Sequence, residues 1–270
     1  KQMKNQILKE GEKMKALITG ASSGIGRDMA RVLANMGVEL YLVARRAQRL
    51  GELKEELDVP VHTMVLDLSK KQNCILLYER LKNEQIDILI NNAGLGDYGN
   101  FDETKLSKDI TMIDTNITAL HILTKLFLKD FKQRDHGYIL NVASSAAFLP
   151  GPLMATYYAT KSYVLHLSMA IHKELRKAGS HVSISVLCPG PVKTEFDQVA
   201  NVAFLMEGTS SEKVAATAIW GMFCHHLLIV PGILMKVSRI ACRLRPDTVL
   251  MECSYHIQHH KNHGDHTHGK

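Results

Sequence analysis

A tyrosine and a lysine four residues apart, Tyr157 and Lys161, are the side chains in this sequence whose chemistry is most readily combined. On a helix, residues at this spacing lie on one face with Cβ atoms about 6 Å apart. The ammonium group favours the phenolate and lowers the pKa of the tyrosine from its reference value of about 10. Ser144 stands thirteen positions before the tyrosine, at the end of the strand-like run Tyr138–Val142. These groups together predict a proton-handling site, although the pair alone often occurs by chance.

A glycine-rich turn lies where a strand is expected to pass into a helix. Lys15–Thr19 is an apolar run typical of a buried strand, and residues 27–35 carry apolar side chains at helical spacing. Between them the chain reads Gly20-Ala-Ser22-Ser23-Gly24-Ile25-Gly26. Glycines let a backbone approach a pyrophosphate, and a helix N-terminus offers N–H groups and the positive end of a dipole. The turn therefore predicts a dinucleotide site; the alternative is a turn that binds no ligand.

Two arginines, Arg45 and Arg46, follow the second expected strand over residues 38–43. In a dinucleotide-binding unit, an acidic residue at this point holds the ribose 2′-hydroxyl of NAD. No acid stands here, and guanidinium groups suit the 2′-phosphate of NADP because they bind phosphate in a bidentate way. The position favours NADP(H) over NAD(H). The alternative interpretation is the solvated, basic start of the next helix.

Polar residues also follow the third and fourth expected strands. Asp67 ends the third, where a polar side chain would face the ligand crevice of a parallel sheet, and it is also placed to cap a helix over residues 70–82. Asn91, Asn92 and Gly94 follow the fourth strand, where amides can bond to neighbouring backbone and glycine allows a cofactor to approach. Further on, Asn116 stands among apolar residues, and a buried asparagine must be hydrogen-bonded.

Six strand-like runs alternate with helical segments, which predicts an α/β fold. The expected architecture is a Rossmann-type, doubly wound parallel sheet in three α/β/α layers. Without a linker or an internal repeat, residues 14–253 should form one domain, with a short late strand at 227–230 and a basic helix after it. Loops and helices over about residues 190–250 are expected to form the wall against which a substrate packs. Residues 1–13 are expected to be an extension that could precede a natural start at Met14, 199–208 a mobile segment, and 254–270 a His-rich, disordered tail. That tail has no rigid scaffold, so no metal site is expected.

Composition excludes several other classes of protein. The 270 residues are 46% hydrophobic and 22% charged, which is ordinary for a globular enzyme. The formal net charge is +6, but the positive charge is scattered and is not interleaved with aromatic residues, so no nucleic-acid binding is expected. Five cysteines without CxxC spacing and a polar N-terminus indicate a reduced, cytoplasmic chain, and no run of residues is suited to spanning a membrane.

As a set, these motifs resemble those of the short-chain dehydrogenase/reductase family. The chain carries TGASSGIG from Thr19, NNAG from Asn91, then Asn116, Ser144 and Tyr157-x-x-x-Lys161 in the family's order and spacing. A loop with Pro189, Gly190 and Thr194 follows the sixth strand. The resemblance covers residues 14–195, and the part after it is similar to bacterial DltE-type oxidoreductases. The family spacing favours Tyr157 over Tyr158 and Ser144 over Ser145.

The resemblance implies a role for each site residue. Tyr157 would be the general acid in carbonyl reduction and the base in alcohol oxidation. Lys161 would hold the nicotinamide ribose and lower the pKa of Tyr157, Ser144 would bond to the substrate oxygen, and Asn116 would position a water that links Lys161 to solvent. The expected cofactor-binding residues are Gly20, Ser22, Ser23, Gly24, Ile25, Gly26, Arg45, Arg46, Asp67, Leu68, Asn92, Ala93, Gly94, Tyr157, Lys161, Pro189, Gly190, Val192 and Thr194.

The function expected from these observations is an NADP(H)-dependent carbonyl reductase or alcohol dehydrogenase. The expected pocket wall is apolar, which favours a hydrophobic ketone, aldehyde or alcohol; it comprises Phe148, Leu149, Leu153, Met154, Phe196, Val199, Phe204, Leu205 and Met206. One alternative is a non-catalytic NADP-binding sensor or scaffold on the same fold. Another is membrane-surface binding through the basic C-terminal helix. The resemblance also implies a homodimer or homotetramer.

Overall fold

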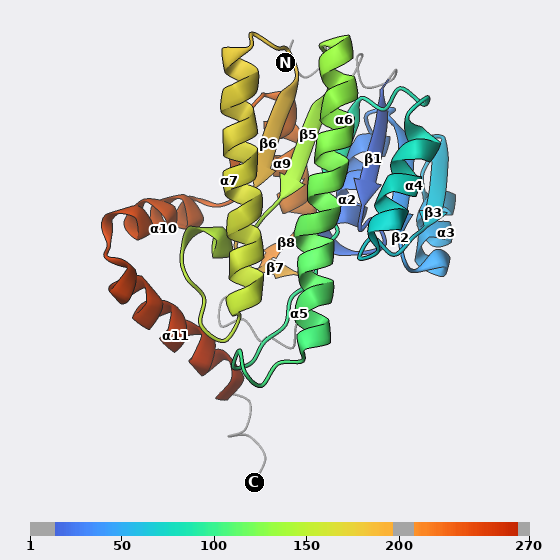
Figure 1. Ribbon diagram of the computed structural model, residues 1–270. Helices are drawn as coiled ribbons and strands as arrows, with labels where there is room; N and C mark the ends of the chain where they lie inside the picture. Colours follow the sequence, from blue (N-terminus) through green and yellow to red (C-terminus); the bar gives the residue numbers. More distant parts are fainter. Residues whose placement is uncertain (1–13, 197–207, 264–270) are drawn as a thin grey trace.

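Parallel strands form the centre of the molecule (Figure 1). The computed structural model describes residues 14–196 and 208–263, with the last four of these as backbone only. Within these ranges a seven-stranded sheet has the order β3-β2-β1-β4-β5-β6-β9, with every pairing parallel. Its strands are β1 (Lys15–Thr19), β2 (Glu39–Ala44), β3 (Val61–Val65), β4 (Ile88–Asn91), β5 (Tyr138–Val142), β6 (Ser183–Leu187) and β9 (Leu228–Ile229).

Helices cover both faces of this sheet. Because side chains alternate along a strand, Ile18 packs into one core and its neighbour Leu17 into the other. The first core lies against α2 (Gly24–Ala34), α3 (Ala47–Glu56) and α9 (Ser211–Phe223), and the second against α4 (Lys71–Leu81), α6 (Leu120–Arg134) and α7 (Ala155–Lys177). The predicted doubly wound sheet in three layers is confirmed.

One helix of the second layer changes its winding partway along. Residues 106–134 comprise α5 (Leu106–Ile113), the π-helical turn η1 (Asp114–Ala119) and then α6. A π-helical turn is rare and is found mostly at functional sites, since it shifts the backbone out of the regular helical hydrogen-bond pattern. Asn116 lies within η1 and is 1% exposed. The buried polar residue singled out in the sequence thus coincides with this irregularity.

Shorter elements complete the described part of the chain. The 3₁₀ turn η2 (Ser145–Phe148) follows β5, and β7 (Val192–Lys193) pairs with β8 (Thr209–Ser210) in a small second sheet. After β9 come α10 (Ile233–Leu244) and α11 (Asp247–His263), which form an arm beside the body of the molecule (Figure 1). Across the described ranges, no helix combines the length and apolarity that crossing a membrane requires.

The C-terminal segment differs from its prediction. Residues 254–263 continue α11 rather than beginning a disordered tail, so the domain boundary predicted at residue 253 falls inside a helix. The physical reason is burial: Ser254 and Gln258 are 2% and 1% exposed, and the side chain of Gln258 donates to the Tyr158 hydroxyl. The expected extension 1–13, the remaining tail 264–270 and all of the expected mobile segment except Gly208 lie outside the described residues.

Candidate active site

A large cavity of about 1070 Å³ lies at the carboxyl ends of the central strands. The residues that follow β1, β2, β3, β4, β5 and β6 line it on the side of the body, and α10 and α11 line it on the opposite side. In an open parallel sheet this edge is where ligands bind, because the strand order reverses there and leaves a crevice. The fold therefore brings the polar residues that follow each strand to one place.

The glycine-rich turn is held against the end of β4. Gly20 has φ +66°, a left-handed conformation that favours glycine. A Cβ atom on Gly26 would lie 2.3 Å from Nδ2 of Asn92, so only glycine fits there. Asn92 donates from the same nitrogen to the carbonyl oxygens of Thr19 and Gly20, each at 3.1 Å. These contacts fix the turn so that the N-terminus of α2 opens on the cavity.

The arginines after β2 do not have equivalent surroundings. Arg45 is exposed and lines the cavity. Arg46 donates to the hydroxyls of Ser22 and Ser23 and forms an ion pair with Glu195 at 2.8 Å. Arg49 pairs with the same carboxylate. These hydrogen bonds from Arg46 and Arg49 hold the pKa of Glu195 below its ordinary value. An acidic side chain thus already occupies part of the basic cluster.

Asp67 lines the cavity beside these arginines, and its alternative interpretation as a helix cap is wrong. The N-cap of α4 is Lys70, whereas Oδ1 of Asp67 accepts from the backbone and the hydroxyl of Ser69 at 3.1 and 2.9 Å. This is an Asx turn, which closes locally after the strand. Burial alone would raise the pKa of Asp67, but the bonds from Ser69 and the charge of Arg45 hold it below its ordinary value.

Lys161 is an ammonium group held in the interior. Its side chain is 5% exposed, and Nζ donates to the carbonyl oxygen of Val142 at 3.0 Å. A Cβ on Gly94 would lie 3.3 Å from Nζ, so glycine keeps the space beside the ammonium open. Burial lowers the pKa of Lys161 to about 8, because removing the charged form from water is unfavourable. The nitrogen lies 5.7 Å from the centre of the Tyr157 ring.

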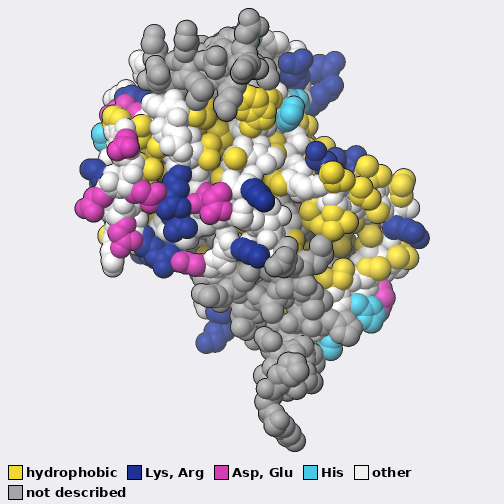
Figure 2. Space-filling view, turned by 180° about the vertical axis from the view of Figure 1, so that it is seen from behind, with side chains coloured by type: hydrophobic (Ala, Val, Ile, Leu, Met, Phe, Trp, Pro, Cys, Tyr) yellow, Lys and Arg dark blue, Asp and Glu magenta, His cyan; other side chains and the backbone are white. Residues whose placement is uncertain are grey.

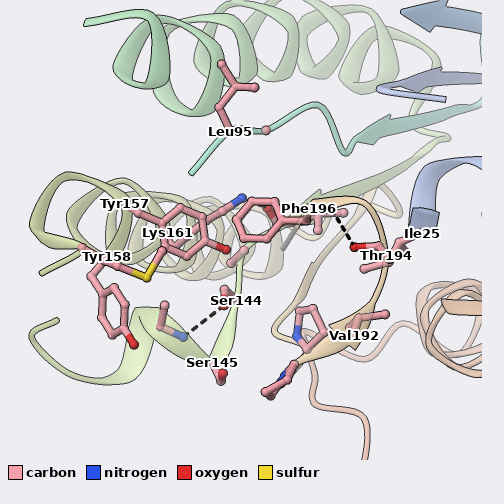
Figure 3. Close-up of a pocket in the computed structure, with 18 of the residues that line it drawn as sticks. Ile25, Leu95, Ser144, Ser145, Tyr157, Tyr158, Lys161, Val192, Thr194 and Phe196 are labelled. Carbon is pink, nitrogen blue, oxygen red and sulfur yellow. Dashed lines mark hydrogen bonds between the residues drawn. The ribbon is translucent and has the colours of Figure 1, made fainter. Parts of the chain in front are cut away.

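Tyr157 and Ser144 meet at the same end of the cavity (Figure 3). Tyr157 projects from the first turn of α7, and its ring packs on Phe196 with centroids 5.4 Å apart. Ser144 lies two residues after the end of β5, and its Oγ accepts from the backbone of Ala146 at 3.1 Å as the cap of η2. In Figure 3 the Tyr157 hydroxyl points to the side of the cavity where Ser144 lies. The cap leaves the serine hydroxyl hydrogen able to turn towards a ligand.

Asn116 is held by three hydrogen bonds of its side-chain amide. Oδ1 accepts from the backbone of Leu95 at 2.8 Å, and Nδ2 donates to the Leu95 carbonyl and to Thr160 Oγ1 at 2.9 and 3.0 Å. The amide therefore ties η1 to the segment after β4 and to α7. These bonds occupy both polar atoms of the Asn116 side chain.

The neighbouring Tyr158 belongs to a different part of the cavity. Its hydroxyl bonds to Gln258 of α11, and the Tyr98 hydroxyl donates to the Gln258 carbonyl at 3.2 Å. Burial raises the pKa of Tyr158, so this phenol stays protonated over a wide pH range. Figure 3 shows the two tyrosine rings pointing in different directions. Tyr158 therefore fastens the C-terminal arm.

Most of the predicted site residues line the cavity together. Gly26 and Asn116 do not line it; they act from behind as supports for the turn and for η1. Of the expected pocket wall, four residues line the cavity, Leu153 lines a separate small hollow, and the other four lie outside the described residues. Over the described ranges, no group of three or more His, Cys, Asp and Glu side chains is placed to hold a metal ion.

The opposite wall comes from α10 and α11. Substrate-binding loops and helices are predicted over about residues 190–250, so the sequence missed only the part of this wall that lies beyond residue 250. A Cβ on Gly190 would lie 2.7 Å from Sδ of Met235, which shows how closely α10 approaches the loop after β6. The signal for α11 was present, since its lining residues recur at helical spacing. The many histidines elsewhere in α11 obscure this signal. The lining residues within the predicted range are Leu234, Met235, Ser238, Ala241, Cys242, Arg245, Val249 and Leu250, and those beyond it are Cys253, Ser254, Ile257 and Gln258.

Comparison with known proteins identifies the family. Residues 14–203 match the family described as short chain dehydrogenase. The chain belongs to this family. It is therefore a nicotinamide-dependent oxidoreductase by class, and its relatives carry the names of dehydrogenases and reductases. Human dehydrogenase/reductase SDR family member 11 is 32% identical over 213 residues, which are 75% of this chain and 80% of that protein.

Two further relatives extend the comparison. The very-long-chain 3-oxoacyl-CoA reductase of Anas platyrhynchos is 31% identical over 201 residues, 70% of this chain. The match spans 63% of that reductase, less than two thirds of its length. A short-chain dehydrogenase from Sphingobium yanoikuyae in complex with NADPH superimposes with a TM-score of 0.78 at 31% identity, covering 85% of this chain and 92% of that one.

Proposed function

We propose that this chain is an NADP(H)-dependent oxidoreductase that interconverts a hydrophobic ketone or aldehyde with the corresponding alcohol. The observation that carries the proposal is the convergence of Tyr157, Ser144 and Lys161 at one end of a largely apolar cavity. Such a group offers a proton donor, a second hydrogen-bond donor for an oxygen, and a positive charge. Proton transfer to a developing alkoxide needs these within hydrogen-bond reach.

Each of these side chains has a separate role towards the substrate oxygen. Tyr157 gives its phenolic proton to the carbonyl oxygen in reduction and takes it back in alcohol oxidation. Ser144 donates a hydrogen bond to the same oxygen and so orients the carbonyl. The ammonium of Lys161 stabilises the phenolate that Tyr157 becomes. Asn116 positions a water that links Lys161 to solvent and so returns a proton. A bound nicotinamide supplies or accepts the hydride.

The residues around the cavity fit this cofactor. The N-terminus of α2 and the hydroxyls of Ser22 and Ser23 suit a pyrophosphate, and the open space at Gly94 beside Lys161 suits a ribose. Arg45 and Arg46 suit a 2′-phosphate, which favours NADP(H). The NADPH complex of the Sphingobium yanoikuyae relative supports the same choice. Glu195 opposes it, because its carboxylate already pairs with Arg46.

The apolar wall favours a bulky, hydrophobic substrate. Phe148, Leu149, Met154 and Phe196 lie on the side of the body, and Leu250 and Ile257 close the cavity from the arm. A carbonyl compound with two large apolar groups would bury both while its oxygen reached Tyr157. We further propose that the protein acts in the cytoplasm as a homodimer or homotetramer, as the family resemblance implies.

The proposal is tested by measuring whether a hydride is transferred from NADPH to a ketone. The protein is incubated with NADPH that carries deuterium at the transferred position of C4 and with a panel of aryl, steroidal and long-chain ketones. We expect NADPH oxidation with at least one class, and an alcohol with one deuterium on its carbinol carbon. Tight binding of NADPH without turnover in either direction, across the ketones and the matching alcohols, would instead support a non-catalytic sensor.

A further inference from the structure

An unpartnered apolar stripe runs along α10. Ile233, Val237, Ile240 and Leu244 are spaced at i, i+4, i+7 and i+11, so they lie on one face of the helix. Their exposed fractions lie between 57% and 81%, although side chains of this kind are usually buried. No residue of α10 is buried. We call these four side chains the α10 stripe. A stripe of this size marks a surface that contacts something else.

The charges beside the α10 stripe are all of one sign. From residue 233 to residue 245 the sequence has four basic residues and no acidic one. Lys236 and Arg243 are exposed and lie on the same flank of the stripe, roughly 80° around the helix from its centre. Figure 2 shows hydrophobic side chains gathered on the C-terminal arm with lysine and arginine side chains at its edge. An apolar face with a basic flank complements a surface that is apolar inside and anionic outside.

A second copy of this chain fits the stripe poorly. In a two-fold contact the same patch faces itself, so Lys236 and Arg243 would meet like charges. An anionic lipid bilayer has the opposite property, because its acyl region accepts the stripe while its headgroups attract the basic flank. The helix has 12 residues and is therefore about 18 Å long, too short to cross a bilayer but suited to lying in its surface.

We propose that α10 docks this protein on the surface of an anionic phospholipid membrane, with the α10 stripe in the acyl boundary and the basic flank at the headgroups. The proposal is independent of the reaction, since it needs neither cofactor nor turnover. It also has a geometric consequence. The side of α10 that faces away from the stripe, with Leu234, Ser238 and Cys242, lines the large cavity. Docking therefore places the cavity wall against the lipid.

The test is co-sedimentation of the full chain with vesicles of phosphatidylcholine alone and with vesicles that contain about one third phosphatidylserine. We expect binding to the anionic vesicles, much weaker binding to the neutral ones, and release as salt rises, because ions screen the attraction. The variant Lys236→Gln/Arg243→Gln should reduce partitioning by about 25-fold, about fivefold for each charge. The variant Val237→Ser/Ile240→Ser should reduce it at least about tenfold, since less apolar area is buried.

Matched variants on the far side of the chain serve as controls. Ile75→Ser/Leu76→Ser removes two exposed apolar side chains from α4, and Lys54→Gln/Lys71→Gln removes two exposed charges from α3 and α4. Neither control should alter partitioning, and thermal melting should show that all four variants are folded. Gel filtration of the wild type and of all four variants measures the oligomeric state.

Three results would overturn the proposal. The first is the absence of binding to anionic vesicles, which would mean that another part of the chain or another protein covers the stripe. The second is an equal loss of binding in the stripe variants and their controls. The third is a change of oligomeric state in Val237→Ser/Ile240→Ser without a change in vesicle binding, which would assign the stripe to a second copy.

Discussion

Lys161 is the single residue at which stability and chemistry conflict most clearly. Its ammonium group is buried, with one hydrogen bond to the Val142 carbonyl. Burial lowers its pKa to about 8, so below that pH the folded chain carries a poorly solvated charge that the unfolded chain exposes to water. This unfavourable contribution to the free energy of unfolding is fully present below about pH 8. It fades as the pH rises towards the ordinary lysine value, because the folded state then releases its proton first.

This conflict predicts the behaviour of Lys161→Met in the absence of cofactor. At pH 7 the variant should melt higher than the wild type by about 5 °C, because it removes the buried charge. The gain should shrink at pH 10, where the native lysine is already neutral. Turnover should fall at least about 100-fold. Calorimetry at both pH values measures the effect, with the exposed Lys173→Met on the same helix as the control; a lower melting temperature at pH 7 would refute it.

At the residue scale, Glu195 also opposes the binding of a cofactor phosphate. Because it pairs with Arg46 and Arg49, it competes with a cofactor phosphate for the same guanidinium groups. Glu195→Gln should therefore lower the KM for NADPH about threefold and leave the KM for NADH unchanged. Arg45→Ala should instead raise the KM for NADPH at least about tenfold, because a guanidinium partner of the phosphate is lost. Steady-state kinetics with both cofactors measures this, and equal changes for the two would refute the NADP(H) preference.

At the scale of elements, the sheet and the basic helix α10 could be predicted, and the C-terminal part of α11 could not. Apolar runs such as Leu17–Ile18 in β1 alternate with helical patterns, and this order alone determines a parallel sheet. The turn from Gly20 to Gly26 follows from local backbone constraints. By contrast, α11 is helical because Ser254 and Gln258 are buried against residues more than ninety positions away. The long-range contacts cannot be read from the sequence, and the surrounding histidines obscure the helical spacing of the lining residues.

The anchoring of α11 yields a prediction about substrate binding. Gln258 bonds to the Tyr158 hydroxyl through its side chain and to the Tyr98 hydroxyl through its carbonyl. Gln258→Ala should loosen the cavity wall, raising the KM for a bulky ketone about tenfold while kcat and the Kd for NADPH change little. Glu252→Ala, on the exposed side of the same helix, is the matched control. A drop in kcat without a change in KM would contradict this role.

At the scale of the whole molecule, the fold gathers a cofactor turn, a proton donor and an apolar wall around one cavity. The turn comes from the first βα unit, the donor from α7 and the far wall from the C-terminal arm. The candidate catalytic residues could be selected from sequence because their spacing is local or follows strand ends. The substrate wall could be predicted only as far as about residue 250, because Ile257 and Gln258 join it through the packing of α11 on the distant Tyr158.

The central claim is that Tyr157, and not the adjacent Tyr158, transfers the proton. The most direct test compares Tyr157→Phe and Tyr158→Phe for NADPH-dependent reduction of the best ketone, with NADPH affinity measured alongside. Tyr157→Phe should lower kcat at least about 100-fold with an unchanged Kd for NADPH, because only the proton donor is lost. Tyr158→Phe should keep kcat within about fivefold and raise the KM for ketone, since it only loosens α11. Wild-type turnover in Tyr157→Phe would contradict the account.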